Sequence, residues 1–129
     1  MRTRYAVALS MLAGIGLGAA AVGHIYAQTK PQPPTYYIAE VEVTNLEGYL
    51  KEFLPRVEAN VKAFGGRVLA ASTKVATIEG EPPKSRVVLL RFDGIEKVQY
   101  WRNAPETKEI RAIGHKYAKF RTFTVEGLP

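Results

Sequence analysis

Residues 85–92 read Ser-Arg-Val-Val-Leu-Leu-Arg-Phe, a β-rich run that follows a turn of Gly, Pro and Lys. Successive side chains of a strand point to opposite faces. Val87 and Leu89 therefore lie on one face, and Val88 and Leu90 lie on the other. Apolar residues on both faces are typical of a strand that is covered on both sides. The fold must supply a cover for each face.

Three further strands are predicted around this one. Residues 36–44 alternate, with Tyr37, Ala39, Val41 and Val43 on one face and Ile38, Glu40, Glu42 and Thr44 on the other. Residues 67–71 and 74–79 predict one strand interrupted by a bulge at Ser72-Thr73, and residues 121–126 predict the last strand.

Two amphipathic helices are predicted between these strands. A capping box of Thr44 and Glu47 begins the first helix, Pro55 is expected to kink or restart it, and Gly65-Gly66 ends it. The second helix is predicted to begin with a capping box at residues 93–96 and to restart at residues 103–105. We expect Asn103 to cap the restarted half, although hydrogen bonding to a ligand is an alternative.

The resulting order is β-α-β-β-α-β, which predicts an α+β domain with a ferredoxin-like antiparallel sheet. The first and third strands are central in this arrangement, and both helices cover the same face. The apolar residues on the other face of residues 85–92 would then meet water. A second copy of the chain is the simplest cover, so we predict a homodimer. The alternative cover is a terminal segment folded over the sheet.

The N-terminus predicts an exported protein. Arg2 and Arg4 precede residues 5–27, which contain no charged residue, as in a secretory signal peptide. Cleavage after Ala27 would release a periplasmic or extracellular domain, whereas an uncleaved run would anchor the domain in the membrane. Residues 28–35 form a proline-rich spacer, and residues 36–127 form the domain.

Composition excludes several classes of site. The 18 Lys and Arg residues and 12 Asp and Glu residues give a net charge of +6, spread along the chain without the dense clusters of a nucleic-acid-binding protein. The absence of cysteine excludes disulfides, thiolate nucleophiles and cysteine-ligated metals. His115 would be the only histidine left after cleavage, and no second ligand stands at a metal-binding spacing from it. We predict no metal and no cofactor.

Several segments together resemble the domain-of-unknown-function family 1330 over Tyr36 to Gly127. They are residues 36–44, Tyr49, residues 65–70, Glu79-Gly80, residues 86–90 and residues 125–127. The resemblance implies a dimeric α/β barrel, an architecture that also hosts cofactorless monooxygenases, haem-degrading enzymes and isomerases. It implies ligands between helices and sheet or inside the barrel. Ala104, Thr107 and Gly114 depart from the Ser, Tyr and Arg expected at these positions.

The candidates for general-base catalysis are Glu40, Glu42 and His115. Both glutamates share the strand face opposite the helices, where solvation or pairing with Arg91 is the alternative role. His115 falls in a row with Lys108, Arg111 and Lys119, which predicts an exposed basic face or a site for an anion or lipid headgroup.

Ligand contacts are expected from a second set of residues, namely Tyr49, Arg67, Arg91, Trp101 and Asn103. Tyr49 and Trp101 lie on apolar helical stripes, which are equally consistent with a role in the core. Three functions stay open: a domain that binds a small organic or anionic ligand, a cofactorless enzyme of the monooxygenase or isomerase kind, and a structural interaction module.

Overall fold

The computed structural model describes residues 32–129, and the predicted signal, its cleavage site and most of the spacer lie outside this range. Within it, every helix is too short or too polar to cross a membrane. The elements, in chain order, are β1 (Thr35–Val43), α2 (Leu46–Gly48), η1 (Tyr49–Phe53), α3 (Leu54–Ala63), β2 (Arg67–Ser72), β3 (Arg86–Phe92), α4 (Ile95–Asn103), α5 (Pro105–Tyr117) and β4 (Ala118–Glu126).

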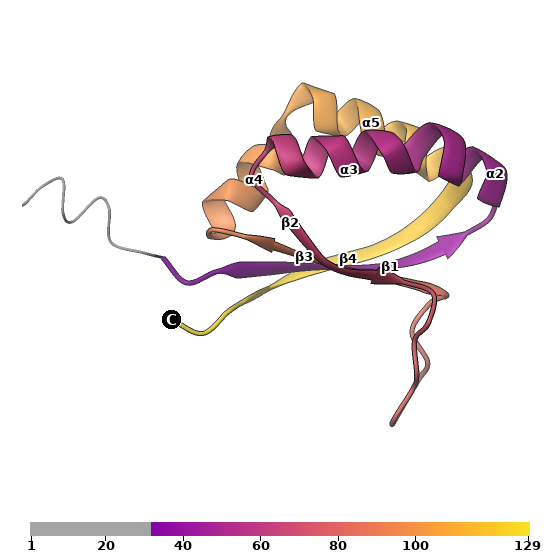
Figure 1. Ribbon diagram of the computed structural model, residues 1–129, viewed down its shortest axis with the longest axis horizontal. Helices are drawn as coiled ribbons and strands as arrows, with labels where there is room; N and C mark the ends of the chain where they lie inside the picture. The colour runs from indigo at the N-terminus through magenta and orange to yellow at the C-terminus, as the bar shows by residue number, and fades with distance from the viewer. Residues whose placement is uncertain (1–31) are drawn as a thin grey trace, which may run out of the picture. The chain divides into compact units, whose positions relative to one another are not determined.

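The four strands form one antiparallel sheet in the order β2-β3-β1-β4. The predicted ferredoxin-like α+β fold is therefore confirmed, with the first and third strands at the centre. Figure 1 shows that the helices form a single layer over one face of the sheet. We call this the covered face and its opposite the open face.

The core lies between the helices and the covered face. Tyr37, Ala39 and Val41 of β1 and Leu90 of β3 all point into it and are buried. Trp101 of α4 stacks on Phe92, with ring centroids 5.1 Å apart. The alternation predicted for residues 36–44 holds along the buried part of β1, because every second side chain is buried from Thr35 to Val41.

The first helical segment departs from regular α-helix before Pro55. The side chain of Asn45, not Thr44, caps the N-terminus by accepting a hydrogen bond from the Gly48 amide at 3.1 Å, so the predicted capping box is wrong by one position. Residues 49–53 form a π-helical turn, and α3 restarts at Leu54 with Pro55 in its first turn. Proline has no amide hydrogen to donate, which explains the predicted restart.

The end of α3 follows the glycine prediction. Gly65 adopts a positive φ of 82°, where a side chain would be strained. The amide of Gly66 donates to the Val61 carbonyl at 2.9 Å, and the amide of Gly65 donates to the Lys62 carbonyl at 3.1 Å. These two bonds form a Schellman motif and turn the chain into β2.

The prediction for the second strand is partly wrong. β2 ends at Ser72, and residues 74–79 form no strand, since no neighbouring strand pairs with them. The register shift lies between Val68 and Ala70, not at the predicted Ser72-Thr73. Residues 73–85 therefore form a long exposed connection in which the Ile78 side chain is 93% exposed.

The second helix is broken in two, as predicted, but neither expected cap forms. α4 has Gly94 as its N-cap, while Asp93 interacts with Arg91 at 3.4 Å. α5 has Ala104 as its N-cap, so Asn103 is the last residue of α4 and does not cap α5. Both N-termini lack a side-chain hydrogen bond.

The open face has no cover within the described residues. Ile38 of β1 pairs with Leu89 of β3 and with Phe123 of β4, which places three apolar side chains in a row across the sheet. Phe123 is 44% exposed and Val125 is 52% exposed. This face is the one that the sequence predicted to lack a helix.

Candidate functional site

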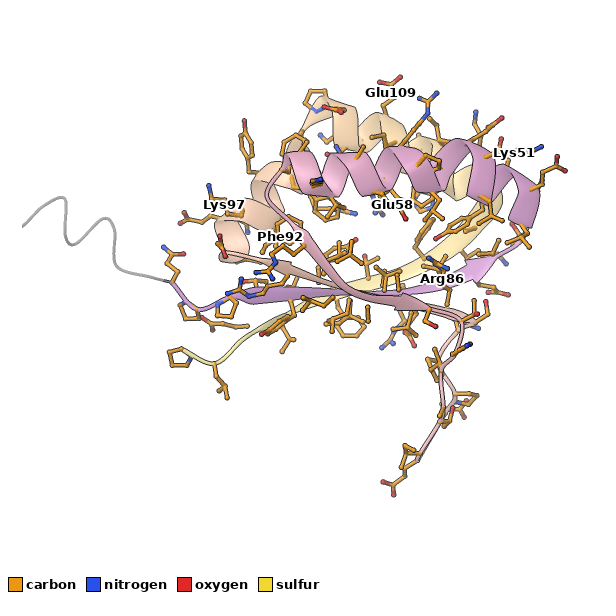
Figure 2. All side chains as sticks on the ribbon, in the orientation of Figure 1. Lys51, Glu58, Arg86, Phe92, Lys97 and Glu109 are labelled. Atoms are coloured by element: carbon orange, nitrogen blue, oxygen red, sulfur yellow. The ribbon has the colours of Figure 1, made fainter. Side chains whose placement is uncertain are left out.

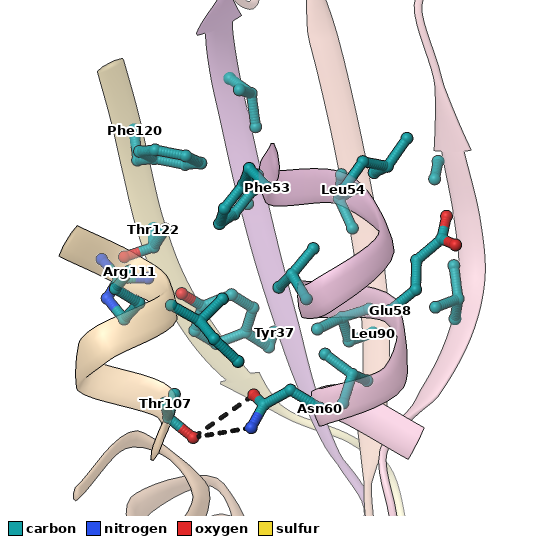
Figure 3. Close-up of a pocket in the computed structure, with 18 of the residues that line it drawn as sticks. Tyr37, Phe53, Leu54, Glu58, Asn60, Leu90, Thr107, Arg111, Phe120 and Thr122 are labelled. Carbon is teal, nitrogen blue, oxygen red and sulfur yellow. Dashed lines mark hydrogen bonds between the residues drawn. The ribbon is translucent and has the colours of Figure 1, made fainter. Parts of the chain in front are cut away.

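A cavity of about 80 Å³ lies between the helix layer and the covered face. Its walls come from η1 and α3 above, from all four strands below, and from α4 and α5 at one side (Figure 3). Most of the lining is aromatic or aliphatic. The apolar side chains include Tyr37, Tyr49, Phe53, Val57, Val61, Val88, Leu90, Trp101, Ile110 and Phe120.

A buried hydrogen-bond network forms one wall of this cavity and ties three helices together. The indole Nε1 of Trp101 donates to Asn60 Oδ1 at 2.6 Å. Asn60 Nδ2 donates to Thr107 Oγ1 at 3.2 Å, and that hydroxyl is 3.3 Å from Asn60 Oδ1 (Figure 3). Because these buried polar groups satisfy one another, the network stabilises the packing of α3 on α4 and α5.

Two arginines meet the hydroxyl of Tyr37 at the α5 side of the cavity. Arg102 Nη1 donates to Tyr37 Oη at 3.2 Å. Arg111 lines the cavity beside Tyr37 and Thr122 (Figure 3). Burial lowers the pKa of Arg111, and the nearby charge of Arg102 lowers it further, while Tyr37 opposes the shift. An anion placed here would stabilise the charged guanidinium groups.

Arg86 occupies the opposite part of the lining, on the helix-facing side of the sheet (Figure 2). Its Cζ lies 5.8 Å from the centroid of the Tyr49 ring, and its buried Nε has no hydrogen-bond partner among the described residues. Burial raises the pKa of Tyr49, and the positive charge of Arg86 partly opposes that shift.

The charge of the lining is unbalanced. It contains the guanidinium groups of Arg86 and Arg111 and the carboxylate of Glu58, which is exposed. Within residues 32–129, neither arginine has a carboxylate oxygen within 4.0 Å. A partly buried cation without an acidic partner is costly, so the cavity favours a ligand that carries negative or hydrogen-bond-accepting groups.

The structure brings together only two of the five predicted ligand contacts. Tyr49 and Trp101 are buried and line the cavity. Arg91 lies on the open face, where it pairs with Asp93, and exposed Arg67 lies opposite Arg91 in the sheet. Asn103 is exposed at the end of α4 and lines a groove on the outer surface of the helices.

The candidate bases lie away from the cavity. Glu40 is on the open face, where its carboxylate, 14% exposed, pairs with Arg121 of the neighbouring strand β4. Glu42 is 3.9 Å from the amine of Lys84. The expected partner of both glutamates, Arg91, contacts neither, because it stands four residues further along β3 than the position opposite Glu40.

His115 is exposed on α5, in the same outer groove as Asn103. The predicted basic row is real for Lys108, Arg111 and His115, but Lys119 belongs to β4 because the helix ends at Tyr117. In the described part of the chain, no three His, Asp or Glu side chains gather as a metal site would require. The absence of a metal stays a prediction.

Sequence reasoning missed Asn60, Thr107, Arg86 and Arg111 as cavity residues. Asn60 interrupts an apolar stripe of the first helix, next to buried Val61, which is a usable signal for a buried polar group. Arg86 precedes Val88 and Leu90 on the covered face of β3, so the alternation of this strand predicts that the Arg86 side chain also points inward.

Two departures from the family pattern have structural roles. Thr107 completes the network, and a Cβ on Gly114 would lie only 2.6 Å from the Phe53 ring.

Comparison with known families confirms the resemblance predicted for Tyr36 to Gly127. The sequence model of a family described as a domain of unknown function (DUF1330) matches residues 34–128. No curated protein matches the chain.

Solved structures with the same arrangement come from several bacteria. A protein of unknown function from Rhodopseudomonas palustris has a TM-score of 0.61 and 13% identity, over 84% of this chain and 93% of its own. An ethyl tert-butyl ether D family protein from Bacillus halodurans has a TM-score of 0.57 and 17% identity, over 74% and 99%. SnoaB, a cofactor-independent oxygenase from Streptomyces nogalater, has a TM-score of 0.56 and 8% identity, over 76% and 96%. At such low identities, the TM-scores show a shared fold alone.

Proposed function

We propose that this chain, which belongs to the DUF1330 family, is a binding domain that holds a small organic ligand in the cavity between helices and sheet. The observation that carries the proposal is the combination of an apolar lining with Arg86 and Arg111, which lack acidic partners in residues 32–129. Ligand sites in proteins are typically apolar hollows with a few oriented polar groups.

Binding is favoured over general-base catalysis by the positions of the three bases that the sequence predicted. Glu40 and Glu42 are on the other side of the sheet, and His115 is on the outer surface of α5. A base must reach the proton that it abstracts, and none of these three lines the cavity. SnoaB is a cofactor-independent oxygenase, but its likeness to this chain extends only to the fold.

A matched pair on β2 tests the binding proposal. Ala71 lines the cavity and pairs with Val88, whereas Ala70 pairs with Leu89 and faces the other way. Both positions are exposed, so Ala71→Leu and Ala70→Leu should both fold.

The experiment is an NMR titration of each variant with a panel of small neutral and anionic molecules, each of about four to seven non-hydrogen atoms. We expect Ala71→Leu to weaken binding and Ala70→Leu to leave it unchanged. A panel without any binder, or equal effects of the two variants, would contradict the proposal.

We further propose that the open face is covered by a second copy of the chain. The row of Leu89, Ile38 and Phe123 would otherwise remain in contact with water. The same face carries both charge signs, with Glu40 and Arg121 among them, so it can complement itself across a twofold axis.

Neighbouring positions on β4 test the dimer. Phe123 is on the open face, while Thr124 pairs with Tyr37 and is exposed on the opposite face. We expect twice the chain mass by light scattering for the wild type and for Thr124→Lys, and a single-chain mass for Phe123→Lys. A monomeric wild type would refute the dimer while leaving the cavity proposal intact.

Export is also proposed, on the support of the uncharged run at residues 5–27 after two arginines. N-terminal sequencing of the protein from a periplasmic fraction of the native host should begin at Gln28 if the signal is cleaved. An intact Met1 in the membrane fraction would support an anchor instead, and an intact chain in the cytoplasm would refute export.

A further inference from the structure

One side chain lines both the inner cavity and a groove on the outer surface of the helices. A groove of about 410 Å³ runs over α4 and α5 and is lined by Arg102, Asn103, Lys108, Arg111, Ala112 and His115. Of these described residues, Arg111 alone also lines the inner cavity. Arg111 therefore stands between an apolar interior and a polar exterior.

Phe120 lies beside Arg111, between the inner cavity and the groove. Its ring lines the inner cavity, and the Cζ of Arg111 lies 5.9 Å from the ring centroid. The ring of His115, from the outer groove, meets the same phenyl ring edge-on with centroids 5.2 Å apart. Arg111 thus lines both hollows, whereas Phe120 lines the cavity only and contacts Arg111 and His115 of the groove.

The two hollows differ in chemical character. The ionisable residues that line the groove are all of the basic type, namely Arg102, Lys108, Arg111 and His115. No carboxylate lines it within residues 32–129, and none pairs with Arg111 there. The inner cavity is mainly aromatic and aliphatic on the other side of Arg111. A basic residue at the edge of an apolar cavity fits a molecule that is charged at one end and apolar at the other.

We infer that the ligand of the inner cavity is an amphiphilic organic anion whose carboxylate binds Arg111 while its apolar body occupies the cavity. This inference rests on the proposed binding function and specifies its ligand class. Burial and the charge of Arg102 both disfavour the protonated form of Arg111, so an anion at this point relieves an existing electrostatic cost. The charge of Lys108 in the neighbouring groove would add to the attraction for the anion.

The size of the cavity limits the apolar body. A volume of about 80 Å³ is smaller than the ~150 Å³ apolar cavity that accepts benzene in other proteins. A short branched chain of a few carbon atoms fits better than an aromatic ring. Isovalerate, the anion of 3-methylbutanoic acid, is therefore a suitable probe, and isovaleramide is its neutral equivalent of nearly the same shape.

The test compares the two probes by NMR titration of the wild type, Arg111→Gln and Arg86→Gln. Both arginines line the cavity, but only Arg111 also lines the groove. We expect isovalerate to bind the wild type about tenfold more tightly than isovaleramide, since a charge-assisted hydrogen bond to Arg111 favours the anion. This preference should disappear in Arg111→Gln and persist in Arg86→Gln, and added salt should weaken binding of isovalerate only.

Three outcomes separate the inference from the function on which it rests. Equal binding of both probes to the wild type would overturn the anion inference and support a cavity that binds neutral ligands. Loss of the preference in Arg86→Gln, but not in Arg111→Gln, would move the carboxylate to the other end of the cavity and overturn the inference as well. Binding of neither probe would count against both proposals. Where Arg111→Gln fails to fold, Arg86→Gln still decides, because a preference that persists there supports Arg111 and one that disappears there overturns the inference.

Discussion

Leu89 and Leu90 are identical neighbours on one strand, yet they lie in different surroundings. Leu90 is 4% exposed beneath the helices, whereas Leu89 is only partly buried on the open face. The same contrast holds on the central strand, where Tyr37 and Ala39 are buried and Ile38 between them is not. The strand sequence supplies apolar side chains to both faces, but the helices within residues 32–129 cover only one.

Coverage also varies within the covered face itself. On the α5 side, the Phe53 ring packs directly against Gly114. On the β2 side, Val68 points toward the helices but is still 51% exposed. The cavity extends toward this thinly covered edge, where Val68 and Ala71 line it. The tightly packed α5 side therefore holds the cavity residues in place, and the loosely covered β2 side leaves the space that forms the cavity.

The first prediction compares the two leucines directly. In the Phe123→Lys background, which removes the proposed dimer contact, Leu90→Ala should lower the free energy of unfolding by about 2–5 kcal/mol. Leu89→Ala should lower it much less, because its side chain already meets water in a single chain. Urea unfolding followed by circular dichroism measures both. Equal losses would mean that the open face has another cover.

The second prediction concerns the network that holds the helices over the covered face. Thr107→Val keeps the shape of the side chain but leaves Asn60 Nδ2 without its acceptor. We expect a loss of about 1–3 kcal/mol in the free energy of unfolding. Thr122→Val is the control, since Thr122 lines the same cavity outside this network. Urea denaturation followed by Trp101 fluorescence measures both, and a larger loss in Thr122→Val would show that the network is not the main polar support.

The third prediction tests the missing cap of α5. Ala104 is extended at the N-cap position, so in Ala104→Ser the new hydroxyl oxygen can accept a hydrogen bond from a backbone amide of the first turn. The free energy of unfolding should rise by about 1 kcal/mol. Ala112→Ser, in the middle of the same helix, should give no increase. Thermal unfolding of the two variants measures the difference, and equal midpoints would mean that α5 gains nothing from a cap.

The smallest predicted effect is a pH dependence from the covered face. Because burial raises the pKa of Tyr49 above 10.0, the folded chain keeps this proton to higher pH than the unfolded chain does. Tyr49 therefore contributes stability below its unfolded pKa that is lost as pH rises through the folded pKa. The free energy of unfolding should fall less steeply above about pH 10 in Tyr49→Phe than in the wild type. Chemical denaturation at a series of pH values measures the slopes, and parallel curves would contradict the assignment.

Alternation and spacing predicted most of the fold because each depends on residues close in the chain. The strand faces of residues 36–44 and the break at Pro105 follow from such local patterns. The N-caps lie one residue later than predicted, at Asn45 and Gly94, because a capping box specifies a cap only approximately. Residues 74–79 have a strand-like composition but no partner, and pairing is not a local property.

The site was less predictable because it depends on distant residues. Tyr49 and Trp101 were found because apolar stripes indicate which side chains turn inward. The bond between Asn60 and Thr107 joins positions 47 residues apart, which no local pattern indicates. Arg67 was misplaced because β2 directs it to the open face opposite Arg91. The cavity itself depends on the volumes of side chains that meet across two layers.

The register shift in β2 has a consequence for solubility. β2 is an edge strand, and an unpaired edge can recruit a strand from another molecule into a growing aggregate. The shift between Val68 and Ala70 interrupts the regular spacing of backbone groups along this edge. An incoming strand would lose its hydrogen-bond register at Leu69, although the side chains nearby are apolar and exposed. Deleting Leu69 would remove this irregularity, and the edge strand could then pair with strands of other molecules and aggregate.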